Sequence, residues 1–308
     1  MIVVTGAAGF IGSHLVAEWR RRGASVVGVD RRPGTDVRAD LADPAAHGDA
    51  FDLLREADAV FHLAGAGGVR LDGPEAEVTW WRSNVETTEA VLAAVPAATP
   101  LVVASSSSVY GGTLGRPSRE DDRLRPRGGY ARSKVAAECR VGLRLAAGGR
   151  AAMARPFTVA GERQRPDMAL ASWIAAARAG EPITIHGALD RRRDVTDVRD
   201  VAVALAEMAE RDVVGPLNVG TGLSRSLGDL VAAVVAAVGP APVVVDGVHR
   251  HDVDATLADP GRCRRLLGFV PHSDLAELVR RQAAASAAGA GEPQPAAVAS
   301  AGASAGAT

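Results

Sequence analysis

Short, continuous apolar runs alternate in the first half of the chain with longer segments whose apolar residues recur at helical spacing. A strand buried on both faces of a parallel sheet reads as a continuous apolar run, whereas an amphipathic helix has a 3.6-residue period. Strands and helices that alternate in this way form a parallel, doubly wound α/β sheet. The pattern predicts strands at residues 2–4, 26–30, 37–41, 59–63 and 101–104, and helices at residues 80–94 and 130–147.

Glycines at three-residue spacing, Gly6, Gly9 and Gly12, follow the first strand. In a strand–turn–helix unit the first glycine permits a sharp turn, the second leaves room for a pyrophosphate, and the third lets the helix pack closely. The helix N-terminus also directs free N–H groups toward phosphate. Because a helical pattern continues to Gly23 and Asp30 ends the next strand, we expect a Rossmann dinucleotide site rather than an ordinary tight turn.

Asp30 indicates which dinucleotide binds. A carboxylate here accepts hydrogen bonds from the adenosine ribose and repels a 2′-phosphate, which favours NAD over NADP. Arg31 and Arg32 act against this preference, because arginines can pair with such a phosphate. Asp40, near the next short strand, has two interpretations: it lies beside the adenine, or it caps a helix that starts near Pro44.

The composition is that of an ordinary globular protein, with 308 residues, 47% hydrophobic residues and a formal net charge of −1. Without an overall basic charge, we expect neither nucleic acid nor anionic membranes as partners. Glycine and serine interrupt the opening apolar stretch and it has no basic leader, so we expect no signal peptide or spanning helix, and a cytoplasmic protein. Cys139 and Cys263 lack clustered ligands, so we expect reduced thiols and no metal site.

Four serines, residues 105–108, directly follow the strand at residues 101–104. Serine runs are common in solvated loops, but here the run begins at the carboxyl edge of the sheet, where ligands of this architecture bind. Further along, Tyr130 and Lys134 share one face of a predicted helix. An ammonium beside a phenol lowers the phenol's pKa from about 10, so this pair suits a general base.

In this order, the glycine turn, Asp30, the serine run and the Tyr130–Lys134 pair resemble the extended short-chain dehydrogenase/reductases that act on nucleotide sugars. The resemblance extends from residue 1 to about residue 271. It implies NAD as the cofactor, a nucleotide sugar as the substrate, and a homodimer formed through the helices that hold Asn84 and Tyr130. Later segments that carry it are residues 155–168, 193–201, 218–222, 258–259 and 266–271.

The resemblance also implies roles for individual residues. Tyr130, as a phenolate, takes the proton from the sugar O4, while Lys134 tunes the phenol and binds the nicotinamide ribose. Ser106, five residues before Gly111, is the implied catalytic hydroxyl, and the next two serines compete closely for that role. The implied cofactor contacts are Gly6, Gly9, Phe10, Ile11, Gly12, Asp30, Arg31, Asp40, Leu41, Leu63, Ala64, Gly65, Asn84, Tyr130, Lys134 and Pro156.

Two details resemble the UDP-glucuronate 4-epimerases within this family: residues 68–70, and Thr158 where 4-epimerases of neutral sugars tend to have asparagine. They imply conversion of UDP-glucuronate to UDP-galacturonate through a transient 4-keto sugar, a β-keto acid whose carboxylate must be held still to prevent loss of carbon dioxide. The implied substrate contacts are Arg70, Ser106, Ser107, Ser108, Tyr130, Thr158, Arg165 and Arg193.

Other reactions stay open. A 4-ketoreductase of a deoxysugar pathway keeps the same serine, tyrosine and lysine, and a UDP-glucose 4-epimerase is a further alternative. Dehydratases and decarboxylases of the family carry acids just after the catalytic hydroxyl, where this chain has Ser107 and Ser108, so both are disfavoured. A redox-sensing or scaffold protein of this fold typically loses the tyrosine or the lysine, and this chain keeps both.

We expect three parts in the chain. An NAD-binding Rossmann domain covers residues 1–155 with a return segment at about 194–211, a smaller α/β substrate-binding lobe covers residues 156–282, and a disordered tail covers residues 283–308, where no large side chain can build a core. Some positions depart from the family pattern and put the nucleotide contacts in doubt: Thr87, Ala160, Asp197, Arg199 and Asp254.

Overall fold

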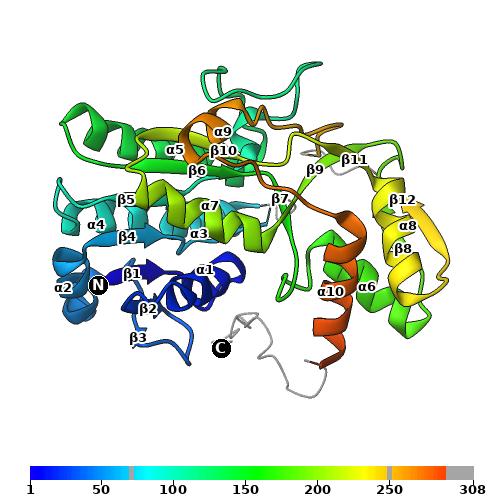
Figure 1. Cartoon of the computed structure of the whole chain (residues 1–308), viewed down its shortest axis with the longest axis horizontal. Coiled ribbons are helices and arrows are strands. Elements are labelled where there is room, and N and C mark those ends of the chain that lie inside the picture. The colour runs from blue at the N-terminus through cyan, green and yellow to red at the C-terminus, as the bar shows by residue number, and fades with distance from the viewer. Residues whose placement is uncertain (69–72, 248–251, 289–308) are drawn as a thin grey trace, which may run out of the picture.

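A seven-stranded parallel sheet forms the centre of the computed structural model, which describes residues 1–68, 73–247 and 252–288 (Figure 1). The strand order β10-β6-β5-β4-β1-β2-β3 reverses next to β1, the place where doubly wound sheets bind ligands. The predicted doubly wound Rossmann sheet is therefore confirmed. Its strands are β1 (Ile2–Thr5), β2 (Val26–Asp30), β3 (Val37–Arg38), β4 (Ala59–His62), β5 (Leu101–Ala104), β6 (Ala152–Pro156) and β10 (Gly215–Val219).

Alternating side chains along the strands divide the large domain into two cores. Val4 and Phe61 point into a core on one face, whereas Val3 and Val60 point into the other. Both sets are almost completely buried, as expected for strands covered on both faces. On the first face lie α1 (Phe10–Arg21), α7 (Val198–Glu210) and α9 (Gly261–Leu267), and on the second lie α2 (Gly48–Glu56), α4 (Thr87–Ala94) and α5 (Gly128–Ala146).

The helix predicted at residues 80–94 is present but interrupted. It consists of α3 (Pro74–Trp81), a π-helical turn η2 (Arg82–Glu86) and α4. Such π turns are frequent at functional sites, because the extra residue redirects a side chain. Here the turn contains Asn84.

The smaller lobe lies beside the large domain, on the right of Figure 1. Its third core joins apolar residues of α6 (Ala169–Ala179), α8 (Leu227–Val238) and α10 (Leu275–Ala288). A three-stranded sheet, β11-β9-β7, connects the lobe to the large domain, and β12 pairs with β8. These strands are β7 (Thr158–Ala160), β8 (Ile183–His186), β9 (Arg192–Asp197), β11 (Ser224–Ser226) and β12 (Val243–Asp246).

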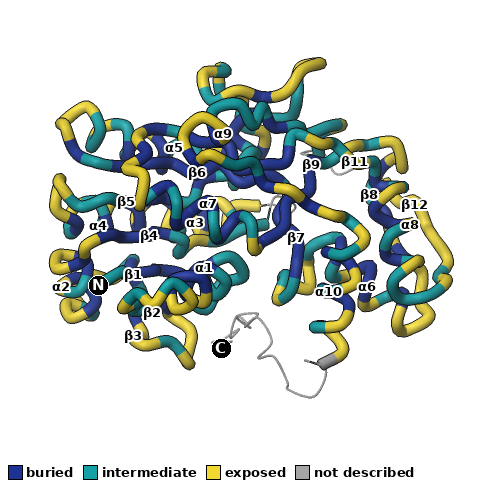
Figure 2. Tube along the Cα trace, viewed as in Figure 1, coloured by how far each residue is buried: buried dark blue, intermediate teal, exposed yellow. Residues whose placement is uncertain are grey.

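Two boundaries differ from the prediction. Besides α7, both β10 and α9 return to the large domain, because β10 pairs with β6 and Cys263 of α9 is buried in the first core. The tail predicted from residue 283 is wrong for residues 283–288, which complete α10 (Figure 2). Ala283 is 4% exposed in the third core. An alanine suffices there because earlier turns already dock the helix. Residues 289–308 lie outside the described residues.

Within the described part of the chain, no helix combines the length and apolarity needed to cross a membrane.

Candidate active site

The glycine turn between β1 and α1 lies against the end of β4. Gly6 has a φ of +70°, and a Cβ on it would lie 2.6 Å from the backbone N of Ala64. Cβ atoms on Gly9 and Gly12 would lie 2.8 and 2.1 Å from the carbonyl O of Gly6. Side chains do not fit at these positions, so the turn presents bare backbone that a pyrophosphate can approach. Phe10 and Ile11 follow in the first turn of α1, partly buried against the first core.

Asp30 links the end of β2 to this turn. Its Oδ2 accepts a hydrogen bond from the N–H of Ala8 at 3.0 Å, and its Oδ1 accepts one from the N–H of Arg32 at 3.0 Å. The Arg32 Nε lies 3.4 Å from the same Oδ1. A carboxylate has about four acceptor positions, so Asp30 keeps capacity for ribose hydroxyls. Because Asp30 holds Arg32, the exposed Arg31 is the more available of the two arginines.

The structure distinguishes the two interpretations of Asp40. Asp43, not Asp40, caps the 3-10 turn η1 (Pro44–Ala46). Asp40 instead bonds an N–H of its own loop, and its Oδ2 lies 3.4 Å from the Nη2 of Arg82. The contact of Asp40 with adenine therefore stays a prediction. Leu41 is 4% exposed in the second core, so only its backbone is available to a cofactor.

The loop after β4 is held by Asn84. Asn84 is 1% exposed; its Oδ1 accepts from the N–H of Ala66 at 3.0 Å, and its Nδ2 donates to the carbonyl O of Ala66 and to the Ser133 Oγ, each at 3.0 Å. Asn84 therefore holds the loop after β4 in place, and its contact with the cofactor stays a prediction. A Cβ on Gly65 would lie 2.5 Å from the Asn84 Oδ1. Leu63, Ala64 and Pro156 complete the edge at the ends of β4 and β6.

The α5 face that carries Tyr130 and Lys134 lies along the end of β5. The Ser106 side chain lies close enough to the Tyr130 phenol to lower its pKa, and the Lys134 Nζ donates to the carbonyl O of Ala104 at 2.9 Å. Ser106 also begins the 3-10 turn η3 (Ser107–Tyr110) and caps it by accepting the N–H of Ser108 at 3.1 Å. Among the three candidate serines, Ser106 is thus the one that acts on the phenol, and its catalytic role stays a prediction.

The electrostatics of the pair differ from the expectation. Burial raises the pKa of Tyr130, and the two groups that lower it are the Ser106 hydroxyl and the Arg165 guanidinium. Burial lowers the pKa of Lys134 to about 8, while the Glu138 carboxylate opposes that shift. The prediction that Lys134 lowers the phenol's pKa is therefore replaced by one in which Ser106 and Arg165 do so.

Sequence patterns did not single out His62, the last residue of β4. It is 2% exposed, and its Nδ1 lies 2.8 Å from the Thr5 Oγ1. The same hydroxyl oxygen also accepts the N–H of Ala64 at 3.3 Å. Burial, together with the Lys134 charge, lowers the pKa of His62 to about 3, so the ring is neutral. The only signal in the sequence was a polar residue closing an apolar run.

Besides Ser106 and Tyr130, three hydroxyls are predicted to bind substrate. The Ser108 Oγ is buried and has no hydrogen-bond partner among the described residues. A buried hydroxyl without a partner is costly, so this one suits a polar ligand group. Thr158 begins β7, partly buried, where β7 pairs with Val195 of β9. Ser107 lies partly buried in η3.

The predicted arginines divide into three cases. Arg165 makes a bidentate pair with Asp167, both distances 2.9 Å, and its Nη1 lies 2.6 Å from where a Cβ on Gly67 would be. The Arg165 guanidinium therefore packs against Gly67 in the loop after β4, and it is close enough to Tyr130 to lower the pKa of the phenol. Arg193 is on β9, and its Nη1 donates to the carbonyl O of Arg192 at 2.9 Å. Arg70 lies outside the described residues.

The departures from the family pattern have partners in the lobe. Arg199 pairs with Glu162, and Asp197 pairs with Arg281 of α10 while its Oδ1 accepts the N–H of Arg199 at 2.9 Å. Ala160 is fully buried in the third core. The exchanged residues thus join α7 and β9 to α10. The Asp254 side chain is 93% exposed and lies 3.1 Å from Arg191, and the Thr87 hydroxyl donates to the Ser83 carbonyl at 2.7 Å.

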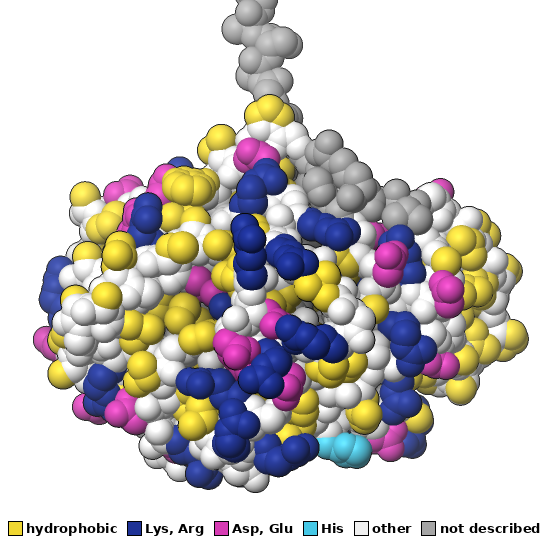
Figure 3. Space-filling model, turned by 90° about the horizontal axis from the view of Figure 1, so that it is seen from above, with side chains coloured by type: hydrophobic (Ala, Val, Ile, Leu, Met, Phe, Trp, Pro, Cys, Tyr) yellow, Lys and Arg dark blue, Asp and Glu magenta, His cyan; other side chains and the backbone are white. Residues whose placement is uncertain are grey.

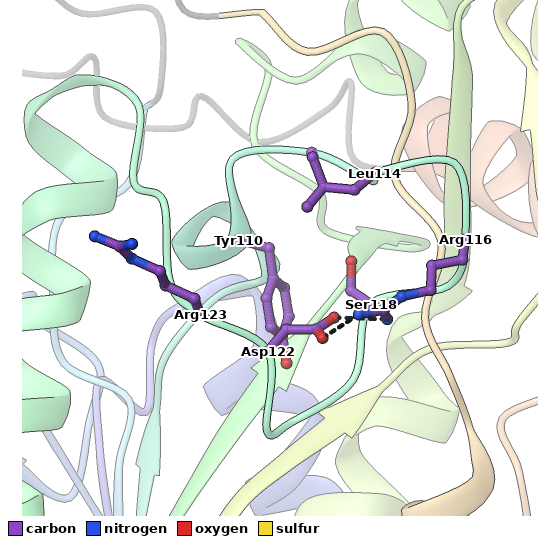
Figure 4. A pocket seen from close by; sticks show the side chains of 7 residues that line it. Tyr110, Leu114, Arg116, Ser118, Asp122 and Arg123 are labelled. Carbon is purple, nitrogen blue, oxygen red and sulfur yellow. Dashed lines mark hydrogen bonds and ion pairs between the residues drawn. The ribbon is translucent and has the colours of Figure 1, made fainter.

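Lys and Arg side chains gather in the middle of the face shown in Figure 3, with Asp and Glu among them. A small pocket beside Tyr110 lies between the aromatic ring and the Arg116–Asp122 ion pair (Figure 4). Its volume of about 10 Å³ admits no more than one water molecule, so it cannot hold a sugar.

Comparisons with known proteins agree with this geometry. The sequence profile of the NAD dependent epimerase/dehydratase family matches residues 2–220. A probable UDP-glucuronate 4-epimerase from Rhizobium meliloti is 31% identical, over 91% of this chain and 94% of that protein. Decarboxylases and a reductase of nucleotide sugars are among the other relatives.

Solved structures match over nearly the whole chain. MoeE5 in complex with UDP-glucuronic acid and NAD is 37% identical with a TM-score of 0.85, over 93% of this chain and 99% of that one. The UDP-glucuronic acid 4-epimerase from Bacillus cereus, also with UDP-glucuronic acid and NAD, is 26% identical with a TM-score of 0.86, over 92% and 98% of the two chains. On its profile match, its relatives and its fold, this chain belongs to the NAD-dependent epimerase/dehydratase family.

Proposed function

We propose that this protein catalyses the NAD-dependent 4-epimerisation of UDP-glucuronate to UDP-galacturonate. The observation that carries the proposal is a convergence at one edge of the sheet, where the Tyr130 phenol, the Ser106 hydroxyl and the bare glycine turn meet. The similarity to proteins that bind UDP-glucuronic acid together with NAD supports the choice of substrate.

The residues of the chain divide the work of an internal redox reaction. NAD, when bound, would supply the redox chemistry, as acceptor of the hydride from C4 and as its donor to the opposite face of the 4-keto sugar. The glycine turn and Asp30 hold the dinucleotide, Tyr130 removes the proton from O4 and later returns it, and Ser106 donates a hydrogen bond to that oxygen as charge develops. Lys134 fixes the end of β5 through the Ala104 carbonyl and binds the nicotinamide ribose.

The acid group of the sugar needs separate control, because a 4-keto uronate loses carbon dioxide when its carboxylate turns perpendicular to the ketone. The unpartnered Ser108 hydroxyl, with Ser107 and Thr158, holds the carboxylate by neutral hydrogen bonds. Arg165 and Arg193 bind the acid or the diphosphate, and so does Arg70.

Incubation of the protein with UDP-glucuronate, followed by NMR, tests the proposal. We expect UDP-galacturonate without added reductant, because hydride is returned in every cycle. Turnover of UDP-glucose as fast as UDP-glucuronate would favour a neutral-sugar epimerase. Reduction of a 4-keto-6-deoxysugar with added NADH, and no epimerisation of either sugar, would favour a ketoreductase.

Thr158→Ala tests the carboxylate contacts. Hydrogen bonds to a charged group contribute about 1.5–3 kcal/mol each, so wild type should prefer UDP-glucuronate over UDP-glucose by at least about tenfold. In Thr158→Ala that preference should shrink, and some intermediate should escape as a decarboxylated pentose product visible by NMR. Ser172→Ala is a matched control, because this exposed hydroxyl on α6 bonds only within its own helix in the described structure.

We also propose a homodimer formed through α3, η2, α4 and α5. The support is exposed apolar surface on these helices: Val78 is 67%, Trp81 48% and Leu143 65% exposed. Light scattering of wild type and Leu143→Glu tests it, since a monomeric wild type contradicts the proposal. The free thiols of Cys139 and Cys263 fit the proposed cytoplasmic location.

A further inference from the structure

The α5 face that holds Tyr130 and Lys134 carries a third polar residue, Glu138, one further turn along. These three side chains contact three successive residues at the end of β5. Tyr130 lies beside Ser106, which lowers its pKa, Lys134 donates to the carbonyl O of Ala104 at 2.9 Å, and Glu138 accepts a hydrogen bond from the hydroxyl of Ser105 at 2.5 Å. Helix α5 thus contacts each residue from Ala104, the last residue of β5, to Ser106, which carries the proposed catalytic hydroxyl.

Glu138 is itself fixed by a buried arginine. Arg155 of β6 donates from Nε to the Glu138 Oε1 at 2.8 Å and from Nη2 to Oε2 at 2.6 Å, and the two side chains are 4% and 8% exposed. The Arg155 Nη1 donates to the Tyr110 hydroxyl at 2.8 Å, which donates to the Asn218 Oδ1 at 2.6 Å. The Arg155 Nη1 also donates to the carbonyl O of Glu120 at 3.2 Å. A bidentate pair held in this way has a defined orientation, which a flexible surface pair lacks.

We propose that Glu138 is a positioning residue of the reaction: clamped by Arg155, it holds Ser105 and thereby sets the Ser106 hydroxyl against the Tyr130 phenol. Ser105 and Ser106 are adjacent, and Ser105 is also anchored by its N–H to the carbonyl O of Ala154 at 2.7 Å. With its backbone and its hydroxyl both held, Ser105 leaves the next residue little freedom. This inference rests on the proposed function, because it assigns Ser106 and Tyr130 to the chemistry.

The same carboxylate has an electrostatic effect on Lys134, one turn away. Burial lowers the pKa of Lys134, and the negative charge of Glu138 raises it again. Without the charge of Glu138, the pKa of Lys134 falls further, so the amine becomes neutral at a lower pH. This gives a second readout, which loss of packing alone would not produce.

Ser105→Ala is the first test, because it removes the link but leaves the Glu138–Arg155 pair intact. The chain has two tyrosines, so the part of the tyrosinate absorbance that is lost in Tyr130→Phe identifies the titration of Tyr130. Ser106 lowers the pKa of Tyr130, so a loosened Ser106 should raise the midpoint of this titration. We expect the raised midpoint in the NAD-loaded protein, and a kcat several-fold lower with KM within about twofold.

Glu138→Gln is the second test, and Glu89→Gln is its matched control. Glu89 of α4 pairs with Arg140, which lies on α5 as Glu138 does, but the Glu89–Arg140 pair is exposed. In Glu138→Gln we expect kcat to fall about tenfold or more, and the basic limb of the pH profile to move to lower pH. Glu89→Gln should leave kcat and the limb unchanged. If Glu138→Gln fails to fold, Ser105→Ala decides alone.

The titration of Tyr130 requires no sugar substrate. The positioning role and the proposed function can therefore be contradicted independently of each other. A folded Ser105→Ala variant with the wild-type midpoint and kcat overturns the positioning role. A raised midpoint in a protein that converts no UDP-sugar supports the positioning role and overturns the proposed function.

Discussion

The two sides of the site are built by different means. On the cofactor side, the glycine turn and Asp30 lie within the first thirty residues, and backbone geometry shapes the turn: Cβ atoms on its glycines would overlap backbone atoms. On the substrate side, the segment that leads from Thr158 to Arg165 is held by a helix far along the chain. Gln282 of α10 accepts the N–H of Gly161 at 3.1 Å and donates to the Gln164 Oε1 at 2.7 Å.

This difference indicates which side of the site tolerates amino-acid substitutions. A turn without room for a side chain permits few substitutions, because any Cβ disturbs the phosphate cradle itself. A loop held by side chains of a distant helix can shift while the large domain keeps its fold. Asp197, one of the residues that depart from the family pattern, forms an ion pair with Arg281 on the substrate side. Substitutions should therefore separate cofactor binding, chemistry and substrate binding.

The largest expected effect comes from Tyr130→Phe. Loss of a general base costs on the order of 10²–10⁴-fold in kcat. Retained NAD, measured after denaturation of the purified protein, should stay at the wild-type level, because the turn and Asp30 are untouched. Turnover within a few-fold of wild type would refute the assignment of the base.

Gly12→Ala should act on the cofactor side. The added Cβ would lie 2.1 Å from the carbonyl O of Gly6, so the turn must move, and we expect the Kd for NAD to rise at least about tenfold. Gly142→Ala is the control: nothing lies within 4 Å of its Cβ, and it is inside α5. That variant should gain about 0.5–1 kcal/mol in the free energy of unfolding. Equal NAD binding by both variants would contradict the distinction.

Gln282→Leu should act on the substrate side. It leaves the buried N–H of Gly161 unpaired, which costs about 1–3 kcal/mol. We expect KM for UDP-glucuronate to rise several-fold by steady-state kinetics, with the Kd for NAD within about twofold. Arg280→Ala, an exposed position of the same helix, controls for general effects on α10. A larger effect on NAD than on the sugar would reverse the comparison.

The smallest effects concern the end of the chain. Deletion after residue 288 keeps α10 complete, and Tm and activity should match wild type. Deletion after residue 283 removes the last turn of α10, with a Tm lower by about 2–4 °C, a shift that corresponds to roughly 1 kcal/mol. A large fall in Tm after the first deletion would show that residues beyond 288 contribute to stability.

Local patterns in the sequence were enough to predict five of the seven strands of the central sheet, β1 to β5. Strands buried on both faces, the glycine spacing and the acid at residue 30 depend on neighbours within thirty positions, so periodicity and turn chemistry identify them. The Tyr130–Lys134 face of α5 was likewise visible from helical spacing.

Only the tertiary structure decided which residues meet. The sequence left three candidate serines, and the structure shows that Ser106 caps η3 and lowers the pKa of the phenol. It also shows that the π turn buries Asn84 against the loop after β4, which the sequence did not indicate. Glu138 lies at the expected helical spacing, but its importance depends on Arg155, which arrives on another strand. The returns of β10 and α9 and the docking of α10 also rest on long-range packing. Such contacts leave no periodic signal, because their partners are brought together by folding and not by sequence distance.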